Sequence, residues 1–190
     1  MSGHVDGSLR VWNKAMGRCD QALQGHTDGV LCLASWEQYL VSGSNDHTIR
    51  VWDRGGARGS WPCLGTVSSH TGMVRSVIVW NGRVISGSDD KKIMVHSIAS
   101  RQHEATLDAH TGAVLALAVS GEKLYSTGHD GTICEWVLGT WGRLRTIRVG
   151  EHVPDVSHPR CLAMSGSMLV CGGYRKMCKT GLCWCSTPGR

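Results

Sequence analysis

The sequence predicts an all-β protein built from repeated units of about 40 residues, and two features that recur in step carry this prediction. One is a stretch that reads as a strand, a polar turn and a second strand, found at residues 2–13, 41–53, 85–97 and 125–137. Its terminal side chains are Trp12, Trp52, His96 and Trp136, which lie 40, 44 and 40 residues apart. The other is a histidine 26 residues before the last three of these positions, at His26, His70 and His110. Two markers in register over three units indicate an internal repeat.

Each complete unit is expected to contain four strands. The third is the clearest, because side chains alternate between polar and apolar from Thr48 to Val51, the period of two expected of a half-buried strand. The first strands follow the histidines, at residues 30–34, 74–79 and 114–119. A second strand precedes the polar turn, and a fourth leads to the next histidine, at residues 63–67, 103–107 and 144–148. Four short strands in a unit of ~40–45 residues are typical of a β-propeller blade.

The composition limits the partners and the compartment. The chain has 190 residues, with 25 glycines, no phenylalanine and 18% charged residues, which suits many short strands joined by tight turns. The net charge of +5 comes without a dense run of lysine and arginine, so we expect no nucleic-acid partner. We also expect no membrane association, because the sequence has no apolar leader and no apolar run of spanning length. Nine cysteines, an odd number, favour reduced thiols and a cytoplasmic location, with the nucleus as an alternative.

The recurring residues resemble those of the WD-repeat β-propeller family. A blade of that family carries Gly-His near its start and Trp-Asp about 26 residues later, as in Gly25-His26 and Trp52-Asp53. The next two units keep only the histidine of the first pair. The resemblance covers residues 2–173 and implies three complete four-stranded blades with a partial blade at each end. It also implies a non-catalytic scaffold for protein–protein interaction, with other proteins or peptides as partners and no cofactor.

The turn between the first and second strands suggests an alternative function. It lacks the Ser-Pro-Asp-Gly run that is common in the family. This short-turn variant is similar to the propellers of F-box and RING ubiquitin ligases and of myosin heavy-chain kinases. The alternative is therefore a substrate-recognition or targeting module whose catalytic part is not in this chain, since the fold alone does not fix the function.

The resemblance implies one hydrogen-bonded network in each blade, made of a histidine, a hydroxyl, the turn aspartate and the tryptophan. Its members would be His26, Ser42, Asp46 and Trp52; His70, Ser86, Asp90 and His96; and His110, Ser126, Asp130 and Trp136, with Asp6 and Trp12 in the first unit. A physical reason stands beside the family. A buried carboxylate must be paired, and an imidazole between a carboxylate and a hydroxyl satisfies both groups. Each such bond contributes about 1 kcal/mol.

Serine, histidine and aspartate are also the members of a hydrolase triad. Three copies at one spacing favour a structural role, because a catalytic site is needed only once. His103-Glu104 begins like the zinc-protease motif HExxH, but the next histidine, His110, lies too far along for one helical face. No phosphate-binding glycine loop occurs either. We therefore expect that this chain is not an enzyme.

The repeat is incomplete at both ends. The first unit begins at the end of its second strand, and the last has predicted strands only at residues 160–164 and 167–173. In that last unit Arg175 stands where the turn aspartate is expected, and the histidine is ambiguous between His152 and His158. We expect a partial propeller over residues 1–173 and a divergent, disordered tail over residues 174–190.

Two interpretations of these ends are open. We favour a fragment of a larger propeller, with further blades from a longer parent chain. Alternatively, residues 160–172 supply the inside of a blade whose outside is residues 8–24. The cysteines near the C-terminus have six, four and one residues between them, at Cys171, Cys178, Cys183 and Cys185. Zinc sites prefer closer pairs, so we expect no metal.

Two groups of residues are candidates for partner binding. Arg75 takes a first-strand position near the central opening, where the neighbouring units have Leu31 and Leu115. Three basic side chains are expected beside it and would suit an acidic partner: His47, Lys91 and Lys92. The alternative is that Arg75 pairs with a turn carboxylate such as Asp90.

The second group consists of tryptophans outside the repeat position: Trp36, Trp61, Trp80 and Trp141. In a four-stranded meander their connections emerge on the face opposite the aspartate turns. Large aromatic side chains gathered on one face are typical of binding surfaces. The alternative is that these indoles fold over the blade edges and close the core.

Overall fold

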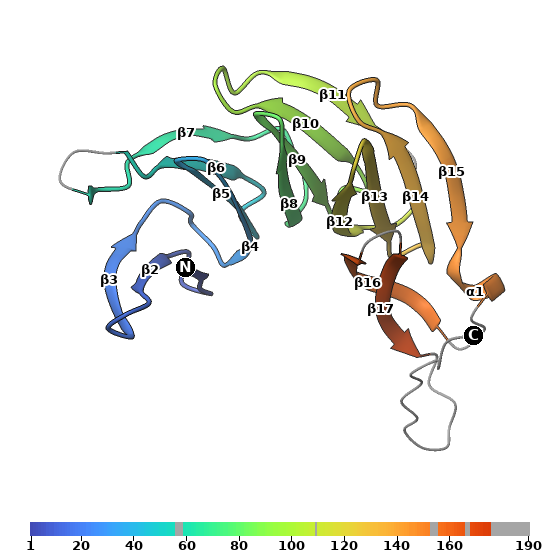
Figure 1. Ribbon diagram of the computed structural model, residues 1–190, viewed down its shortest axis with the longest axis horizontal. Helices are drawn as coiled ribbons and strands as arrows, with labels where there is room; N and C mark the ends of the chain where they lie inside the picture. Colours follow the sequence, from blue (N-terminus) through green and yellow to red (C-terminus); the bar gives the residue numbers. More distant parts are fainter. Residues whose placement is uncertain (56–58, 109, 153–155, 166–167, 176–190) are drawn as a thin grey trace.

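The computed structural model describes residues 1–55, 59–108, 110–152, 156–165 and 168–175. The chain forms separate antiparallel sheets that stand side by side in an open arc (Figure 1). We call each sheet a blade and number the blades from the N-terminus, so that blades 2, 3 and 4 are the four-stranded sheets. The predicted all-β fold is confirmed, with three complete blades and a partial blade at each end.

The strands of each complete blade follow one another in chain order. Blade 2 consists of β4 (Val30–Trp36), β5 (Tyr39–Ser44), β6 (Ile49–Asp53) and β7 (Cys63–Val67). Blade 3 consists of β8 (Val74–Trp80), β9 (Arg83–Ser88), β10 (Ile93–Ser97) and β11 (His103–Leu107). Blade 4 consists of β12 (Val114–Ser120), β13 (Lys123–Gly128), β14 (Thr132–Val137) and β15 (Arg143–Arg148). Two-residue turns such as Asn81-Gly82, with φ of 45° and 71°, join the first two strands, because left-handed turns match the strand twist.

The partial blades contain the outer strands at one end and the inner strands at the other. Blade 1 consists of β1 (Ser2–Gly3), β2 (Leu9–Asn13) and β3 (Arg18–Leu23). Blade 5 follows the short helix α1 (Val149–His152) and consists of β16 (Val156–Ser165) and β17 (Met168–Arg175). Both strands of blade 5 extend beyond the predicted 160–164 and 167–173. Residues 176–190, with most of the predicted tail, lie outside the described residues.

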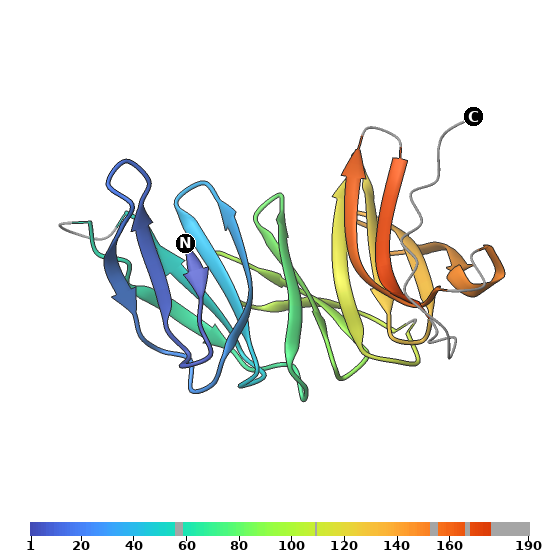
Figure 2. The same cartoon turned by 90° about the horizontal axis from the view of Figure 1, so that it is seen from below.

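The first strands of successive blades line the concave side of the arc. Figure 2 looks onto this side, where β4, β8, β12 and β16 lie next to one another. Three apolar clusters fill the spaces between blades 1 and 2, blades 2 and 3, and blades 3 and 4. The core therefore lies between blades, and each blade depends on its neighbours for burial.

A glycine–valine contact recurs between blades. A Cβ atom added to Gly43 would stand 2.6 Å from Val74 Cγ1 of the next blade. A Cβ atom added to Gly87 would stand at the same distance from Val114 Cγ1. Glycine is required here because the valine of the following first strand packs directly against the backbone.

The two ends of the arc do not meet in this structure. Blade 1 and blade 5 are separate sheets and lie at opposite ends of the ribbon (Figure 1). Residues 160–172 therefore do not pair with residues 8–24 of the same chain. In the part of the chain that is described, no helix is both long and apolar enough to cross a membrane.

Candidate functional site

Two kinds of loop meet on one edge of the arc, which we call the upper rim. It consists of the loops leading into the first strands (residues 27–29, 71–73 and 111–113) and the aspartate turns (residues 45–48, 89–92 and 129–132). Backbone hydrogen bonds join them in each complete blade: Asn45 N donates to Gly29 O at 2.9 Å, Asp89 N to Met73 O at 2.9 Å, and His129 N to Ala113 O at 2.8 Å. The chain topology alone brings these loops together. In an antiparallel meander, the turn between the second and third strands lies at the same edge of the sheet as the start of the first strand.

In blade 2 the four expected residues form one connected network beneath the rim. His26 Nδ1 lies 2.8 Å from Asp46 Oδ2, and His26 Nε2 lies 2.7 Å from Ser42 Oγ. Trp52 Nε1 donates to Ser42 Oγ at 2.9 Å. An indole N–H can only donate, so Ser42 accepts from Trp52, and its own hydroxyl is free to donate to the imidazole. The imidazole then donates from Nδ1 to Asp46.

Blade 4 repeats this arrangement. His110 Nε2 lies 2.8 Å from Ser126 Oγ, and Trp136 Nε1 donates to the same oxygen at 3.0 Å. His110 Nδ1 lies 3.1 Å from Asp130 Oδ2. Repetition of the same geometry 84 residues apart shows that the spacing of the residues, and not a single local environment, produces the network.

Two threonines belong to the network, although they are not among the residues predicted from the sequence. Thr48 Oγ1 donates to Asp46 Oδ1 at 2.7 Å, and Thr132 Oγ1 donates to Asp130 Oδ1 at 2.7 Å. The available signal was the Asp-x-Thr pattern in two of the aspartate turns. Blade 3 has Lys92 at this position, so its aspartate lacks the hydroxyl donor.

The network shifts the titration of its members. Burial alone would raise the pKa of Asp46, but hydrogen bonds from Thr48, the Thr27 amide and His26 outweigh it and lower the pKa to about 2. Burial lowers the pKa of His26 below its usual 6.5, and the bond to Asp46 offsets this only in part. Asp46 is therefore ionised and His26 uncharged at neutral pH.

Blade 4 differs because a cysteine lies close to its histidine. Burial lowers the pKa of His110, but Cys134 and Asp130 more than compensate and the pKa is raised. Cys134 is fully buried as a free thiol on β14. The hydrogen bonds with His110 and Thr146 lower its pKa despite burial.

In blade 3 the structure does not bring His96 into the network. His70 Nδ1 lies 2.7 Å from Asp90 Oδ2, and His70 Nε2 lies 2.8 Å from Ser86 Oγ. His96 Nε2 instead lies 3.0 Å from Ser69 Oγ, and its buried Nδ1 has no hydrogen-bond partner. The imidazole is too short to reach Ser86 as an indole does. The prediction for His96 is corrected on this point.

Blade 1 has a different set of contacts at the equivalent positions. Trp12 Nε1 donates to Ser2 Oγ at 2.8 Å, and His4 Nε2 lies 2.7 Å from the same oxygen. Asp6 Oδ1 accepts from the Ser8 hydroxyl at 2.6 Å and so caps its own turn. Asp6 and Trp12 are therefore not linked to each other through a histidine.

The Ser-His-Asp sets are unsuited to attack on a substrate. Ser42, Ser86 and Ser126 are fully buried, and each is enclosed between the strands of its own blade. Among the described residues, no group of three or more His, Cys, Asp or Glu side chains could hold a metal ion. Cys178, Cys183 and Cys185 lie outside the described residues.

Exposed basic residues occupy unusual backbone positions on the upper rim. His47 has φ of 68° and Lys91 has φ of 72°, in the left-handed region that side chains with a Cβ rarely adopt. The equivalent residues of blades 1 and 4 are Gly7 and Gly131, both with φ of 78°. Both His47 and Lys91 are exposed, as is the neighbouring Lys92.

Arg75 lies on the same rim and forms an ion pair. Its Nε and Nη2 donate to the two carboxylate oxygens of Asp89 at 2.8 and 2.7 Å. Arg75 therefore pairs with a turn carboxylate, as the alternative predicted, but the partner is Asp89 and not Asp90, because Asp90 points inward to His70. The side chains of Arg75 and Asp89 are 39% and 28% exposed, so the guanidinium remains accessible.

The four tryptophans outside the repeat position are half-buried and pack against the apolar clusters. Trp36 stacks on Tyr39 at 6.2 Å between ring centroids, and its ring approaches Gly82 in the next blade. Trp80 meets Trp141 of the next blade edge-to-face at 5.9 Å. Trp61 packs on the cluster between blades 1 and 2. These indoles therefore lie at contacts between neighbouring blades.

Comparison with known proteins agrees with this architecture. The family described as WD domain, G-beta repeat matches residues 17–53, 61–97 and 101–136. Mitochondrial division protein 1 of Aspergillus oryzae is 31% identical over 135 residues, which are 70% of this chain and 19% of that protein. The APC/C activator protein CDH1 of Saccharomyces cerevisiae is 31% identical over 78% of this chain and 26% of that protein. The chain thus spans about a fifth to a quarter of the length of these relatives.

Solved structures show the same arrangement of blades. The computationally designed Ika8 protein superposes with a TM-score of 0.77 at 29% identity, covering 90% of this chain and 51% of that one. A chain of the mitotic checkpoint complex superposes with a TM-score of 0.79, covering 90% and 54%, and its 23% identity supports the fold alone. Matching repeats, the buried His-Ser-Asp networks and the blade geometry together show that this chain belongs to the WD-repeat family of β-propeller proteins.

Proposed function

We propose that this chain is a non-catalytic scaffold that binds other proteins or peptides through its upper rim. The networks below the rim fix the aspartate turns, and the side chains above them project into solvent. A rigid support with variable exposed loops is the usual arrangement of a binding surface. The names of the relatives, a mitochondrial division protein and an APC/C activator, are compatible with adaptor roles.

The observation that carries this proposal is the left-handed backbone of His47 and Lys91. Such a conformation costs about 1–2 kcal/mol for a residue with a Cβ. Glycine would remove this strain, and two other blades have glycine there. Strained residues of this kind concentrate at functional sites. Both positions hold large basic side chains on neighbouring blades, which favours a role in contact with a partner.

Arg75 indicates the chemistry of that partner. Its guanidinium is held in a fixed orientation by Asp89 and lies on the same rim as the exposed Lys91 and Lys92. A carboxylate-rich segment could share or replace Asp89 as the bidentate acceptor, since arginine forks match carboxylate geometry. An acidic peptide is therefore the partner that this rim fits.

An affinity comparison tests the proposal. Wild-type chain and the Arg75→Glu variant would be used to capture partners from cell extract, with identification by mass spectrometry. The matched control is Arg83→Glu, because Arg83 also pairs with a carboxylate, Glu104 at 2.6 Å, and is similarly exposed. Partners lost with Arg75→Glu and kept with Arg83→Glu support the rim. Identical partner sets for all three proteins at equal melting temperature would exclude it.

A second candidate is a substrate-recognition or targeting module of a ubiquitin ligase or kinase. The short turns between first and second strands favour it, and one relative is named as an APC/C activator. The full-length transcript would separate the two, because the second candidate requires an attached or associated catalytic or adaptor part.

We further propose a cytoplasmic location, with the nucleus as the alternative. The six described cysteines are free thiols, as in compartments that keep cysteine reduced. Fluorescence microscopy of the tagged chain would test the location.

A further inference from the structure

A β-bulge interrupts the first strand of each complete blade at the same position. Strand pairing skips Leu31 between Val30 and Cys32 in β4, and it skips the equivalent residues Arg75 in β8 and Leu115 in β12. A bulge residue stands outside the ladder of paired residues, and bulges often re-aim a side chain next to an active site. The fold therefore sets these three side chains apart from the rest of their strands.

The three bulge residues lie in a row, because the first strands are neighbours on the concave side of the arc (Figure 2). Cα atoms of β4 and β8, and of β8 and β12, come within 8 Å of each other. Two hydrogen bonds join these strands next to the bulges. Cys32 Sγ donates to Val74 O at 3.5 Å, and Leu117 N donates to Ser76 Oγ at 3.2 Å. Consecutive bulge residues are thus one strand spacing apart.

Apolar and basic side chains alternate along this row. Leu31 is 41% exposed, the Arg75 side chain is 39% exposed, and Leu115 is half-buried. Neither leucine belongs to the apolar clusters that the described residues form between blades. Blade 5 continues the alternation, because strand pairing in β16 skips the exposed Arg160. The row therefore reads leucine, arginine, leucine, arginine from blade 2 to blade 5.

The spacing of the row fits an extended polypeptide. Such a chain advances about 3.3 Å per residue, so side chains on one face recur about every 6.6 Å. This repeat agrees with first strands whose Cα atoms come within 8 Å of each other. Every second residue of an extended segment can therefore meet one bulge residue.

Arg75 can receive a carboxylate without losing its ion pair. Asp89 accepts from Nε and Nη2 of the guanidinium. Nη1 of Arg75 has no hydrogen-bond partner among the described residues. Arginine favours carboxylates because its planar fork matches their geometry, whereas the neighbouring leucines gain from burial against apolar side chains.

We propose that the upper rim binds an extended segment in which apolar and acidic residues alternate. An apolar side chain packs on Leu31, the acidic side chain two residues along accepts from Arg75, and the next apolar side chain packs on Leu115. A second acidic residue lies at Arg160. This inference rests on the proposed binding of an acidic peptide at the rim, and it adds the sequence pattern that the rim selects.

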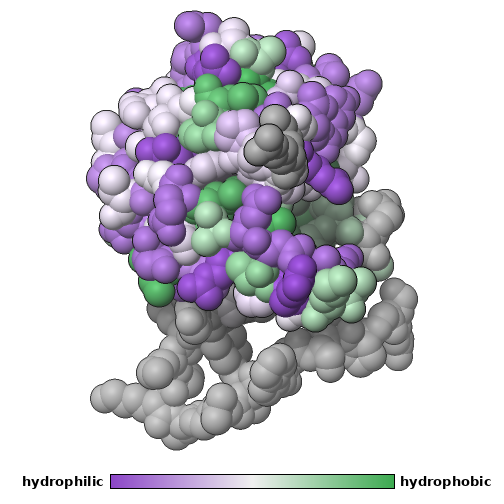
Figure 3. All heavy atoms as spheres, turned by 90° about the vertical axis from the view of Figure 1, so that its left-hand side faces the viewer, coloured by the Kyte–Doolittle hydropathy of each residue, from purple (hydrophilic) through white to green (hydrophobic). Residues whose placement is uncertain are grey.

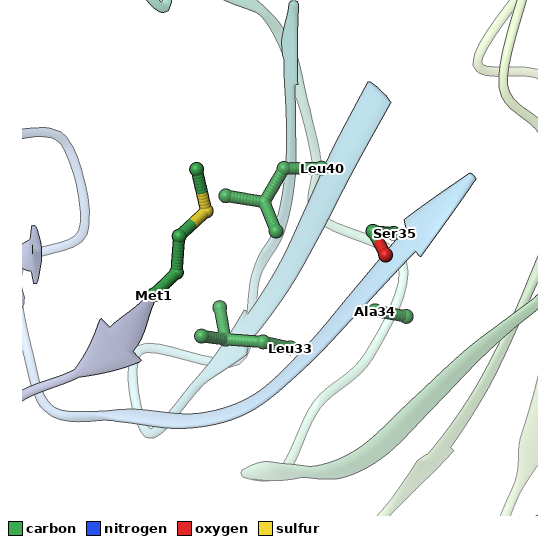
Figure 4. A pocket seen from close by; sticks show the side chains of 5 residues that line it. All are labelled: Met1, Leu33, Ala34, Ser35 and Leu40. Atoms are coloured by element: carbon green, nitrogen blue, oxygen red, sulfur yellow. The ribbon is translucent and has the colours of Figure 1, made fainter. Parts of the chain in front are cut away.

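Two other apolar surfaces of the arc lack this alternation. A hollow of about 230 Å³ between blades 1 and 2 is lined by Met1, Leu33, Ala34, Ser35 and Leu40 (Figure 4), and it offers no arginine or lysine side chain among the described residues. Figure 3 looks onto the left-hand end of the arc in Figure 1, where apolar patches are separated by polar residues. Charge complementarity therefore singles out the row of bulge residues.

Fluorescence anisotropy with two labelled synthetic peptides tests the pattern. The peptide Leu-Ser-Glu-Ser-Leu-Ser-Glu has the alternation, and Ser-Leu-Leu-Ser-Glu-Glu-Ser has the same composition and charge without it. We expect the wild-type chain to bind the alternating peptide at least about 10-fold more tightly. Equal affinities, or no binding of either peptide up to about 1 mM, would overturn the inference.

Exchanging side chains between bulges tests the row itself. The exchange preserves the fold, because the same bulge already accommodates leucine in two blades and arginine in a third. Arg75→Leu should weaken binding of the alternating peptide about 10-fold and should prefer a peptide with leucine in place of the glutamate between the two leucines. Leu31→Arg should prefer a peptide with glutamate in place of one leucine. The matched control is Arg83→Leu, because Arg83 is similarly exposed and lies outside the row, and its affinity should equal that of wild type.

The inference and the proposed function can fail separately. Equal binding of both peptides, together with loss of partners from extract in Arg75→Glu, would overturn the inference and keep the proposed function. A preference for the alternating peptide that Arg75→Leu leaves unchanged would also overturn the inference, because the selection would then arise elsewhere. A preference that follows each exchange would establish that the row selects the sequence.

Discussion

Gly25 and Trp52 are in such close contact that a Cβ atom on Gly25 would stand 2.9 Å from Trp52 Cη2. The residue before the network histidine is small in both blades whose indole reaches the serine: Gly25 precedes His26, and Ala109 precedes His110 in blade 4, where Trp136 donates to Ser126. In blade 3 the corresponding residue is Ser69, whose hydroxyl bonds the smaller His96. A small residue before the histidine and an indole at the repeat position are therefore sterically matched.

This steric match predicts a coupled substitution in blade 3. His96→Trp alone should lower the free energy of unfolding, because the indole would collide with Ser69. Ser69→Gly alone should also lower it, since His96 would lose its remaining hydrogen bond. The double variant should be at least as stable as wild type, with the indole donating to Ser86. A double-mutant cycle from urea midpoints measures the coupling, expected at about 1–3 kcal/mol. Additive effects would show that the two positions are independent.

The network predicts a large difference between two aspartates of the rim. Asp46→Ala removes the acceptor of His26, Thr48 and the Thr27 amide, and should lower the free energy of unfolding by about 2–4 kcal/mol. Asp89→Ala removes only a surface ion pair and should cost about 0–1 kcal/mol. Denaturant midpoints of both variants decide this. Equal midpoints would show that the network is not the main stabilising element of the turn.

Backbone strain predicts that a glycine at position 91 stabilises the folded protein and that a glycine at position 92 does not. Lys91→Gly relieves the left-handed conformation and should raise the free energy of unfolding by about 0.5–1 kcal/mol. Lys92→Gly removes the same charge one residue later, outside the left-handed region, and should lower it. Melting temperatures of the two variants provide the comparison. A fall in both would mean that Lys91 is not strained.

His96 predicts a pH dependence of stability. Burial, with further contributions from His103 and His70, lowers the pKa of His96 to about 4, whereas Glu104 acts in the opposite direction. In the unfolded chain it takes up a proton near 6.5, while in the folded chain it stays neutral to about pH 4. Stability is therefore lost as the pH falls from about 6.5 to 4, by up to roughly 3 kcal/mol.

The variant His96→Phe should lose this component. The measurement is the difference between urea midpoints at pH 7 and pH 4.5, compared between wild type and variant. His47→Phe serves as the control, because His47 is exposed and its substitution should retain the wild-type difference. An unchanged pH dependence in His96→Phe would show that other groups produce it.

The packing of Trp36 and Trp80 between blades predicts that both side chains stabilise the fold. Trp36→Ala and Trp80→Ala should each lower the free energy of unfolding by about 2–4 kcal/mol, because each indole fills space between two blades. Trp12→Ala should have a smaller effect, since Trp12 is more exposed. Thermal melting and acrylamide quenching test this order. Loss of partner binding with unchanged melting would instead assign Trp36 and Trp80 to a binding surface.

The repeat and its strands could be predicted from the sequence because they are properties of local order. Alternation of side chains over five residues defines a strand, and a fixed spacing between His26 and Trp52 recurs wherever the unit recurs. The same spacing placed Ser42 and Asp46 within reach of His26. The left-handed turns were also accessible in principle, since Gly7 and Gly131 occupy the positions of His47 and Lys91.

The tertiary structure decided what depends on the direction of a side chain or on a contact between blades. Asp89 and Asp90 are adjacent in sequence, yet one faces Arg75 at the surface and the other faces His70 inside, because successive strand-end residues point to opposite sides. His96 keeps the spacing of a network residue but is too short for Ser86. The sequence by itself determined the blades and the residues that fix their turns. Only the packing of one blade on the next decided which side chains are buried, since each core lies between two units that the repeat pattern treats separately.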